Sequence, residues 1–127
     1  MPSELDQAMN DAVAMLTAPG GPLETVPFTR DGWSVPMVKN APPSLAHYIA
    51  LYCAQHGDTE FLVDGDIRLT FAEVGAAARA VAGGLVAGHG VQRGERVGIA
   101  ARNSANWIVA YLAVLMAGGC ATLLNGW

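Results

Sequence analysis

The sequence predicts an α/β fold organised around a parallel βαβ unit near its C-terminal end. Two short apolar runs of strand length occupy residues 97–101 and 120–124. Between them lies a helix-permissive stretch, residues 105–117, preceded by the good N-cap types Asn103 and Ser104 and followed by a Gly-Gly stop. Two buried strands joined by a helical crossover are typical of a parallel pair.

The predicted crossover helix is unusually apolar. No residue from Trp107 to Ala117 is charged, and the Tyr111 hydroxyl and the Trp107 indole N–H are the polar groups among these side chains. A helix that is apolar all round is expected to be covered on both sides, and this run is shorter than the ~20 residues of a membrane span. We therefore expect an incomplete N-terminal piece of a larger body. In the isolated chain this helix should leave an apolar patch that promotes self-association.

Residues 3–16 carry apolar side chains at helical spacing, and Ser3-x-x-Asp6 resembles a capping box. A Pro/Gly cluster then predicts a flexible hinge. The segment 26–38 is typical of a hairpin, with Asp31-Gly32 as its turn, and its two prolines confine the strands to an edge.

The next predicted helix begins after Ser44 and ends at Gly57, and a second hairpin turns at Asp64-Gly65. Thr70-Phe-Ala-Glu73 is a capping box that begins a third helix, which ends in the region of Gly88 and Gly90. The sequence thus predicts an N-terminal helix and hinge, an edge hairpin with a linker, and a truncated α/β subdomain, spanning residues 1–22, 23–43 and 44–127.

Composition and charge argue against several classes of protein. The net charge is −4, and the seven basic residues are scattered, which argues against nucleic-acid binding. Two cysteines provide no disulfide framework, so a reducing cytoplasm is expected. The acidic N-terminus lacks the features of a signal peptide, and we expect no transmembrane segment.

Two motifs resemble phosphate-binding loops but are better explained as helix ends. Gly88-His89-Gly90 follows a helix instead of a strand, and Arg93 stands where a dinucleotide loop would have its third glycine, so a helix C-cap is favoured. Arg102-Asn103-Ser104 could hold an anion at a helix N-terminus, but it lacks a Gly-rich approach, so a plain N-cap is favoured. Lys39, the only lysine, lies in a linker, and no P-loop motif occurs.

Two further groups of residues could suggest chemistry. His47, Cys53 and His56 share one predicted helix without a fourth metal ligand, so a buried cysteine and solvent-facing histidines are favoured. A cluster of carboxylates around the second turn is expected to be solvated loop charge, namely Asp58, Glu60, Asp64 and Asp66. We therefore assign no catalytic, cofactor-binding or metal-binding residue in this chain.

The order of short segments from residue 40 onward resembles the adenylate-forming (AMP-binding) superfamily, in particular fatty-acid (acyl-CoA) synthetases. Glu95 replaces an aspartate common in the family's turn, Gly126 replaces a frequent proline, and the chain before Asn40 fits loosely. The matching segments are N-A-P-P-S-L at 40–45, H-G-D-T-E-F-L-V at 56–63, R-L-T-F-A-E-V at 68–74, G-V-Q-R-G-E-R-V-G-I at 90–99, R-N-S-A-N-W-I-V-A-Y-L-A-V-L-M-A-G-G at 102–119 and A-T-L-L-N-G-W at 121–127.

The resemblance implies a parent enzyme that activates a fatty or other carboxylic acid with ATP and Mg²⁺ and transfers the acyl group to CoA. The family's phosphate loop, Tyr-x-x-Thr-Glu segment and C-terminal lysine come later in its order, so the 127-residue chain alone is expected to be inactive and to bind no cofactor. It would act as scaffold for the missing remainder of the enzyme. A cytoplasmic location is expected, and peripheral membrane attachment is compatible with a fatty-acid enzyme.

Two alternatives stay open at this point. A free-standing, non-catalytic interaction module on the same scaffold would end naturally after Trp127, and reading the gene past that codon separates it from a fragment. A relative that adenylates an aryl acid or an amino acid, or that stops at acyl-AMP, would differ in pocket residues that this chain lacks.

Overall fold

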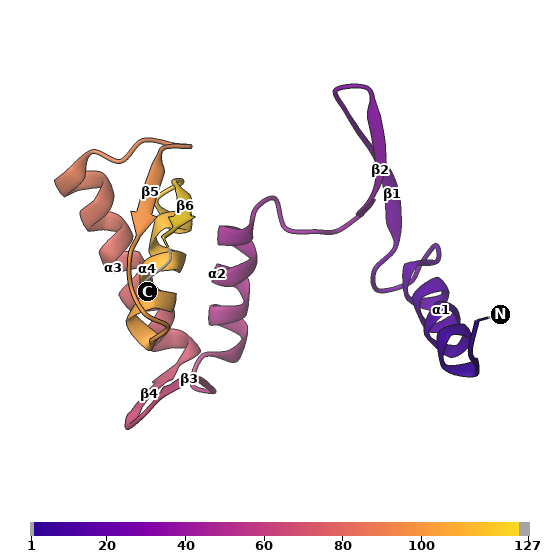
Figure 1. Cartoon of the computed structure of the whole chain (residues 1–127), viewed down its shortest axis with the longest axis horizontal. Helices are drawn as coiled ribbons and strands as arrows, with labels where there is room; N and C mark the ends of the chain where they lie inside the picture. The colour runs from indigo at the N-terminus through magenta and orange to yellow at the C-terminus, as the bar shows by residue number, and fades with distance from the viewer. Residues whose placement is uncertain (1, 125–127) are drawn as a thin grey trace. The chain divides into compact units, whose positions relative to one another are not determined.

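The computed structural model describes residues 2–124. The last three residues of the family-like segment at 121–127 therefore lie outside the described residues. The chain divides into two compact units, residues 1–42 and 43–127, and each is described by itself. Figure 1 shows the elements in chain order.

The first unit contains one helix and one hairpin. Helix α1 (Glu4–Thr17) begins with the predicted capping box, in which Asp6 accepts from the backbone N–H of Ser3. Strands β1 (Thr25–Arg30) and β2 (Trp33–Val38) pair antiparallel with the two prolines opposite each other. The turn residues Asp31 and Gly32 both have positive φ, as a type I′ turn requires. None of residues 2–42 is buried, so this unit has no core of its own.

The second unit alternates helices and strands. In chain order its elements are α2 (Leu45–His56), β3 (Glu60–Asp64), β4 (Ile67–Thr70), α3 (Phe71–His89), β5 (Arg96–Ile99), α4 (Ala105–Met116) and β6 (Cys120–Leu123). The side chains of Ser44, Thr70 and Ser104 cap the three helices as predicted. Gly90 ends α3 in the left-handed conformation that glycine adopts without strain.

The parallel βαβ unit is confirmed. Strand β5 leads through α4 into β6, and the two strands pair in parallel from Arg96 opposite Cys120 to Ile99 opposite Leu123. Gly118, with φ of 81°, reverses the chain after the helix. The predicted α/β fold class, with a partial sheet and flanking helices, is therefore correct.

The core lies between α3 and α4, with α2 packed against both. Small residues on α3 bring the two helices close together, because alanine presents little side chain to a neighbouring helix. The central cluster of buried residues is Val74, Ala78, Ala82, Val109, Leu112 and Ala113.

Among the described helices, α3 alone is long and apolar enough to span a membrane, judged by length and composition. From the sequence we expect no transmembrane segment, because the crossover helix is too short to span a bilayer. Helix α3 supplies Val74, Ala78 and Ala82 to the central cluster, so one of its faces packs in the core, and 22% of its apolar stretch is buried.

The expectation that the crossover helix α4 leaves an apolar patch is wrong. No residue from 107 to 117 is exposed, because α2, α3 and the β5–β6 pair cover the helix on several sides. The predicted apolar patch is therefore not centred on α4. Large apolar side chains that are exposed in this unit lie elsewhere, and they include Leu45, Leu51, Val63, Val81, Leu123 and Leu124.

Candidate functional site

A hollow of about 520 Å³ lies at the first turn of α4. One wall comes from the β3–β4 hairpin and the other from the N-terminal end of the helix. Its lining combines apolar side chains with the polar residues Asp64, Asn103 and Ser104. The lining residues are Leu62, Val63, Asp64, Asn103, Ser104, Ala105, Trp107 and Ile108.

The carboxylate of Asp64 fills the position where this helix would bind an anion. Its Oδ2 accepts a hydrogen bond from the backbone N–H of Ala105 at 2.9 Å, across 41 residues of sequence. Ser104 Oγ accepts from the N–H of Trp107 at 3.2 Å in the same turn. The free N–H groups of a helix start attract negative charge, so an internal carboxylate already satisfies this end.

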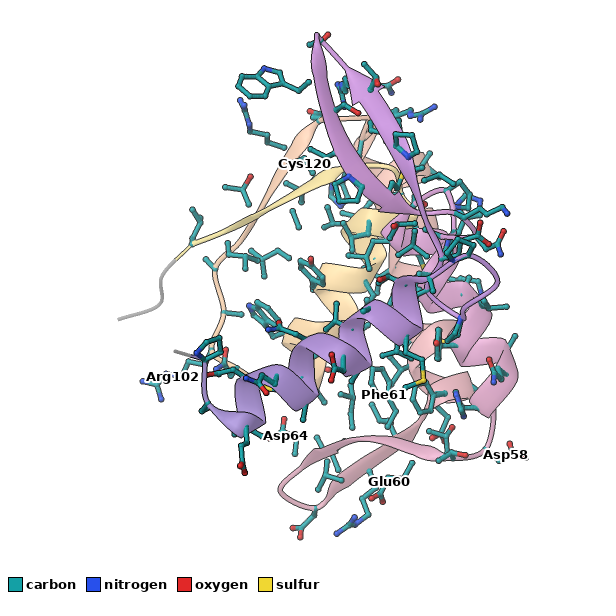
Figure 2. The ribbon with its side chains drawn as sticks, turned by 90° about the vertical axis from the view of Figure 1, so that its right-hand side faces the viewer. Asp58, Glu60, Phe61, Asp64, Arg102 and Cys120 are labelled. Carbon is teal, nitrogen blue, oxygen red and sulfur yellow. The ribbon has the colours of Figure 1, made fainter. Side chains whose placement is uncertain are left out.

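The remaining carboxylates of the predicted cluster do not converge. Glu60 binds the Arg68 guanidinium at 2.8 and 2.9 Å, while Asp58 and Asp66 are exposed. Figure 2 shows Asp58, Glu60 and Asp64 spread apart from one another. The expectation of solvated loop charges holds for Asp58 and Asp66. It is wrong for Asp64, which caps α4, and incomplete for Glu60, which forms an ion pair.

The histidines and cysteine of α2 also lie apart. Cys53 is buried against α3, and this burial raises the pKa of its thiol, with Arg79 opposing the shift. Ser44 Oγ lies 2.7 Å from His47 Nδ1 at the helix start. Among residues 2–124, no group of three His, Cys, Asp or Glu side chains is placed to hold a metal ion.

The second histidine of α2 corrects the expectation that both face solvent. His56 is half-buried and lies between Tyr52, on which it stacks at 5.6 Å, and Phe71, whose ring is tilted against it at 5.2 Å between centroids. Phe71 stacks in turn on Phe61 at 4.2 Å. This row of rings joins α2, β3 and α3, and sequence spacing does not reveal it because its members come from three elements.

The two motifs that resemble phosphate loops are helix ends. Helix α3 ends with Gly88 and His89, and Gly90 is its C-cap. Ser104 is the N-cap of α4, while Arg102 is exposed. The side-chain hydrogen bonds of the described residues serve caps, turns and surface ion pairs, apart from the Asp64 contact. Such an arrangement can hold a scaffold in shape. The Ser44–His47 pair joins a hydroxyl to an imidazole, but it lies exposed at the start of α2, where Ser44 serves as the N-cap.

Comparison with known proteins agrees with this architecture. The sequence model of the AMP-binding enzyme family matches residues 50–126. A medium/long-chain-fatty-acid–CoA ligase, FadD6 of Mycobacterium tuberculosis, is 40% identical over 72 residues, which are 57% of this chain and 12% of the relative.

Solved structures of CoA ligases also match this chain. The O-succinylbenzoate-CoA synthetase MenE of Bacillus subtilis, in complex with AMP, is 33% identical with a TM-score of 0.56, covering 61% of this chain and 20% of its own. The anthranilate-CoA ligase AuaEII, in complex with anthranoyl-AMP, is 26% identical with a TM-score of 0.59, covering 63% and 15%.

The βαβ unit, the capped helices and the matched region together define an α/β piece of an adenylate-forming ligase. The chain belongs to the AMP-binding enzyme family. It spans only about an eighth of the curated relative's length and a fifth or less of these two solved structures.

Proposed function

We propose that this chain is the N-terminal part of an ATP-dependent acyl-CoA synthetase. The parent enzyme joins a carboxylic acid to AMP with release of pyrophosphate, then transfers the acyl group to the thiol of CoA. The observation that carries the proposal is the 40% identity to a medium/long-chain-fatty-acid–CoA ligase. Fatty acids are therefore the first substrate class to test.

The chain's own contribution is structural. Its capped helices and the α3–α4 core form part of an α/β body, and the sequence contains no phosphate-loop motif to hold a transferring phosphate. We infer that residues 1–127 alone form no acyl-adenylate.

We expect no site for ATP or Mg²⁺ among the described residues. No metal-ligand group is present among residues 2–124, and the Asp64 carboxylate would repel a phosphate from the start of α4. ATP, Mg²⁺ and CoA are thus expected to bind the parent enzyme through residues outside this chain, so no catalytic step is assigned to residues within it.

An aromatic acid is the second candidate substrate. The two matched solved structures are an O-succinylbenzoate-CoA synthetase and an anthranilate-CoA ligase. Their identities of 33% and 26% are lower than that of the fatty-acid ligase, and for this reason the fatty acid is preferred.

In the decisive experiment, the whole gene product that contains residues 1–127 is purified. It is incubated with ATP, Mg²⁺, CoA and a panel of medium- and long-chain fatty acids, benzoates and amino acids, and thioesters are identified by mass spectrometry. Fatty acyl-CoA is expected. Aryl-CoA alone would move the assignment to the second candidate, and no thioester with any acid would refute the proposed ligase.

Two further properties follow from the proposal. We expect a cytoplasmic enzyme, since CoA and ATP are available there and the cysteines need no oxidation. We also expect residues 1–127 to self-associate when expressed alone, because apolar side chains such as Leu51, Leu123 and Leu124 are about half exposed. Sedimentation velocity at several concentrations tests this, and a strict monomer throughout would contradict it.

A further inference from the structure

A second hollow, of about 450 Å³, lies between α2, the end of α4 and the turn that precedes β5. It shares no residue with the hollow at the start of α4. Its volume is within the range of small-molecule sites. Because Arg93 is the single arginine or lysine in its lining, we call it the Arg93 hollow.

Arg93 is held in place at the wall of this hollow. Its side chain lies across Gly118, since a Cβ built on that glycine would lie 3.7 Å from Arg93 Cγ. The neighbouring backbone is fixed by a hydrogen bond of 2.8 Å, which the Gly94 N–H donates to the Gly118 carbonyl. Arg93 forms no ion pair with any residue from 2 to 124. Its guanidinium donors are therefore available to an anion.

The other polar groups of the Arg93 hollow also suit an anion. No acidic residue lines it, and the nearby Glu95 carboxylate accepts the Gln92 N–H at 2.9 Å. His47 Nδ1 lies 2.7 Å from Ser44 Oγ. A hydroxyl that donates to Nδ1 leaves the ring proton on Nε2, which makes no hydrogen bond with residues 2–124 and can donate to a ligand.

The rest of the lining is mainly apolar. Leu45 is 48% exposed, while Leu115 and Met116 are half-buried at the end of α4. These side chains gain from contact with an apolar group that removes them from water. A bare phosphate ion would use the basic side chains alone, whereas an acid with an apolar tail would use both parts of the lining.

We propose that the Arg93 hollow binds a monocarboxylate with an apolar tail. The carboxylate accepts hydrogen bonds from the Arg93 guanidinium, which matches its planar geometry, and the tail lies against Leu115 and Met116. The inference goes beyond the proposed function, because no residue here is assigned to activation of an acid. It therefore concerns a second acid-binding site, separate from the one where the parent enzyme forms its adenylate.

Met116 provides a reporter inside the hollow. The whole gene product that contains residues 1–127 is labelled with ¹³C at its methionine methyl groups, and the Met116→Leu variant identifies the Met116 signal. Octanoate is titrated in the absence of ATP, so that no thioester forms. We expect a saturable shift of the Met116 signal with octanoate, and weaker effects of 1-octanol and of inorganic phosphate, which each lack one half of the ligand.

Arg93→Gln should weaken octanoate binding at Met116 by at least about fivefold, because it removes a charge-assisted pair. Arg96→Gln is the matched control, since Arg96 is exposed three residues further on and does not line the hollow. It should leave the Met116 titration unchanged. Equal effects of the two variants would reduce the role of Arg93 to general surface charge and would overturn the site.

A second pair of variants tests the wall without changing an arginine. Leu45→Asp places a negative charge in the lining and should also weaken octanoate binding at Met116. Leu51→Asp places the same charge at an exposed position of α2 outside the hollow and should have little effect. If both aspartates act alike, the acid does not bind in this hollow.

The outcomes also separate this inference from the proposed function. Binding of octanoate at the activation site of the parent enzyme would shift other methionine signals and would not depend on Arg93. An active ligase whose Met116 signal ignores octanoate would overturn this inference and leave the proposed function intact. A Met116 signal that responds to octanoate through Arg93, in a product that makes no thioester, would support the site and refute the ligase. A response to inorganic phosphate as strong as that to octanoate would contradict the role of the apolar tail.

Discussion

Asp64 provides the sharpest test of the structure, because its carboxylate is the one described side chain that hydrogen-bonds across a long stretch of chain in the second unit. Asp64→Ala removes the acceptor for the Ala105 N–H and the negative charge at the start of α4. Loss of an N-terminal cap costs about 0.5–2 kcal/mol, and a charge near a helix start contributes about 0.3–1 kcal/mol.

Ser104 still caps the same turn through the Trp107 N–H, so the two contributions to the free energy of unfolding are not fully additive. We expect Asp64→Ala to lower that free energy by about 1–2 kcal/mol. In a unit of this size the Tm should fall by about 4–8 °C for each kcal/mol. Thermal unfolding followed by far-UV circular dichroism measures the change.

Two companion variants make the result specific. Asp64→Asn keeps an acceptor oxygen without the charge and should lose less stability than Asp64→Ala. Asp66→Ala removes an exposed carboxylate from the same turn and should change stability by less than about 0.5 kcal/mol. If Asp64→Ala and Asp66→Ala unfold at the same temperature, the assignment of Asp64 as the cap of α4 is wrong.

Other predictions concern α3 and its neighbours. Gly75→Ala should destabilise the chain in urea unfolding, since the new Cβ would lie 3.1 Å from Cys53 Cβ, whereas Gly83→Ala has open space and should raise stability by about 0.5–1 kcal/mol. Equal effects of the two variants would argue against close α2–α3 packing. Hydrogen bonds from Thr70 hold the pKa of Glu73 below its usual value, so their stabilisation is present above about pH 4.5 and is lost as the pH falls through the lowered pKa. The backbone N–H of Thr70 is the main donor and its hydroxyl the second. Glu73→Gln removes the titrating carboxylate and should flatten this acid-side dependence in pH-resolved unfolding curves, and an unchanged profile would contradict the capping role.

The features that the sequence predicted well are encoded by near neighbours. Thr70 and Glu73 are three residues apart, and Asp31-Gly32 needs only its own backbone to form a turn. Such local rules fix where helices and hairpins begin and end. The parallel pair was also predictable, because two apolar runs flank a helix of sufficient length.

The features that the sequence did not reveal depend on how elements pack. The Asp64–Ala105 contact joins residues 41 apart, and the ring row through His56 combines three elements. The apolar composition of α4 predicted an apolar patch on this helix, but α2, α3 and the β5–β6 pair cover it, and the exposed apolar side chains lie on other elements. Composition shows how much surface must be buried, and it does not show which neighbour buries it.

The central claim is that these residues are scaffold for a larger acid-activating enzyme. Acid-dependent release of pyrophosphate from ATP, measured side by side for residues 1–127 and for the whole gene product, tests it most directly. We predict release that requires a carboxylic acid from the whole product and none from residues 1–127. Acid-dependent release by residues 1–127 alone, or its absence from the whole product, would contradict the account.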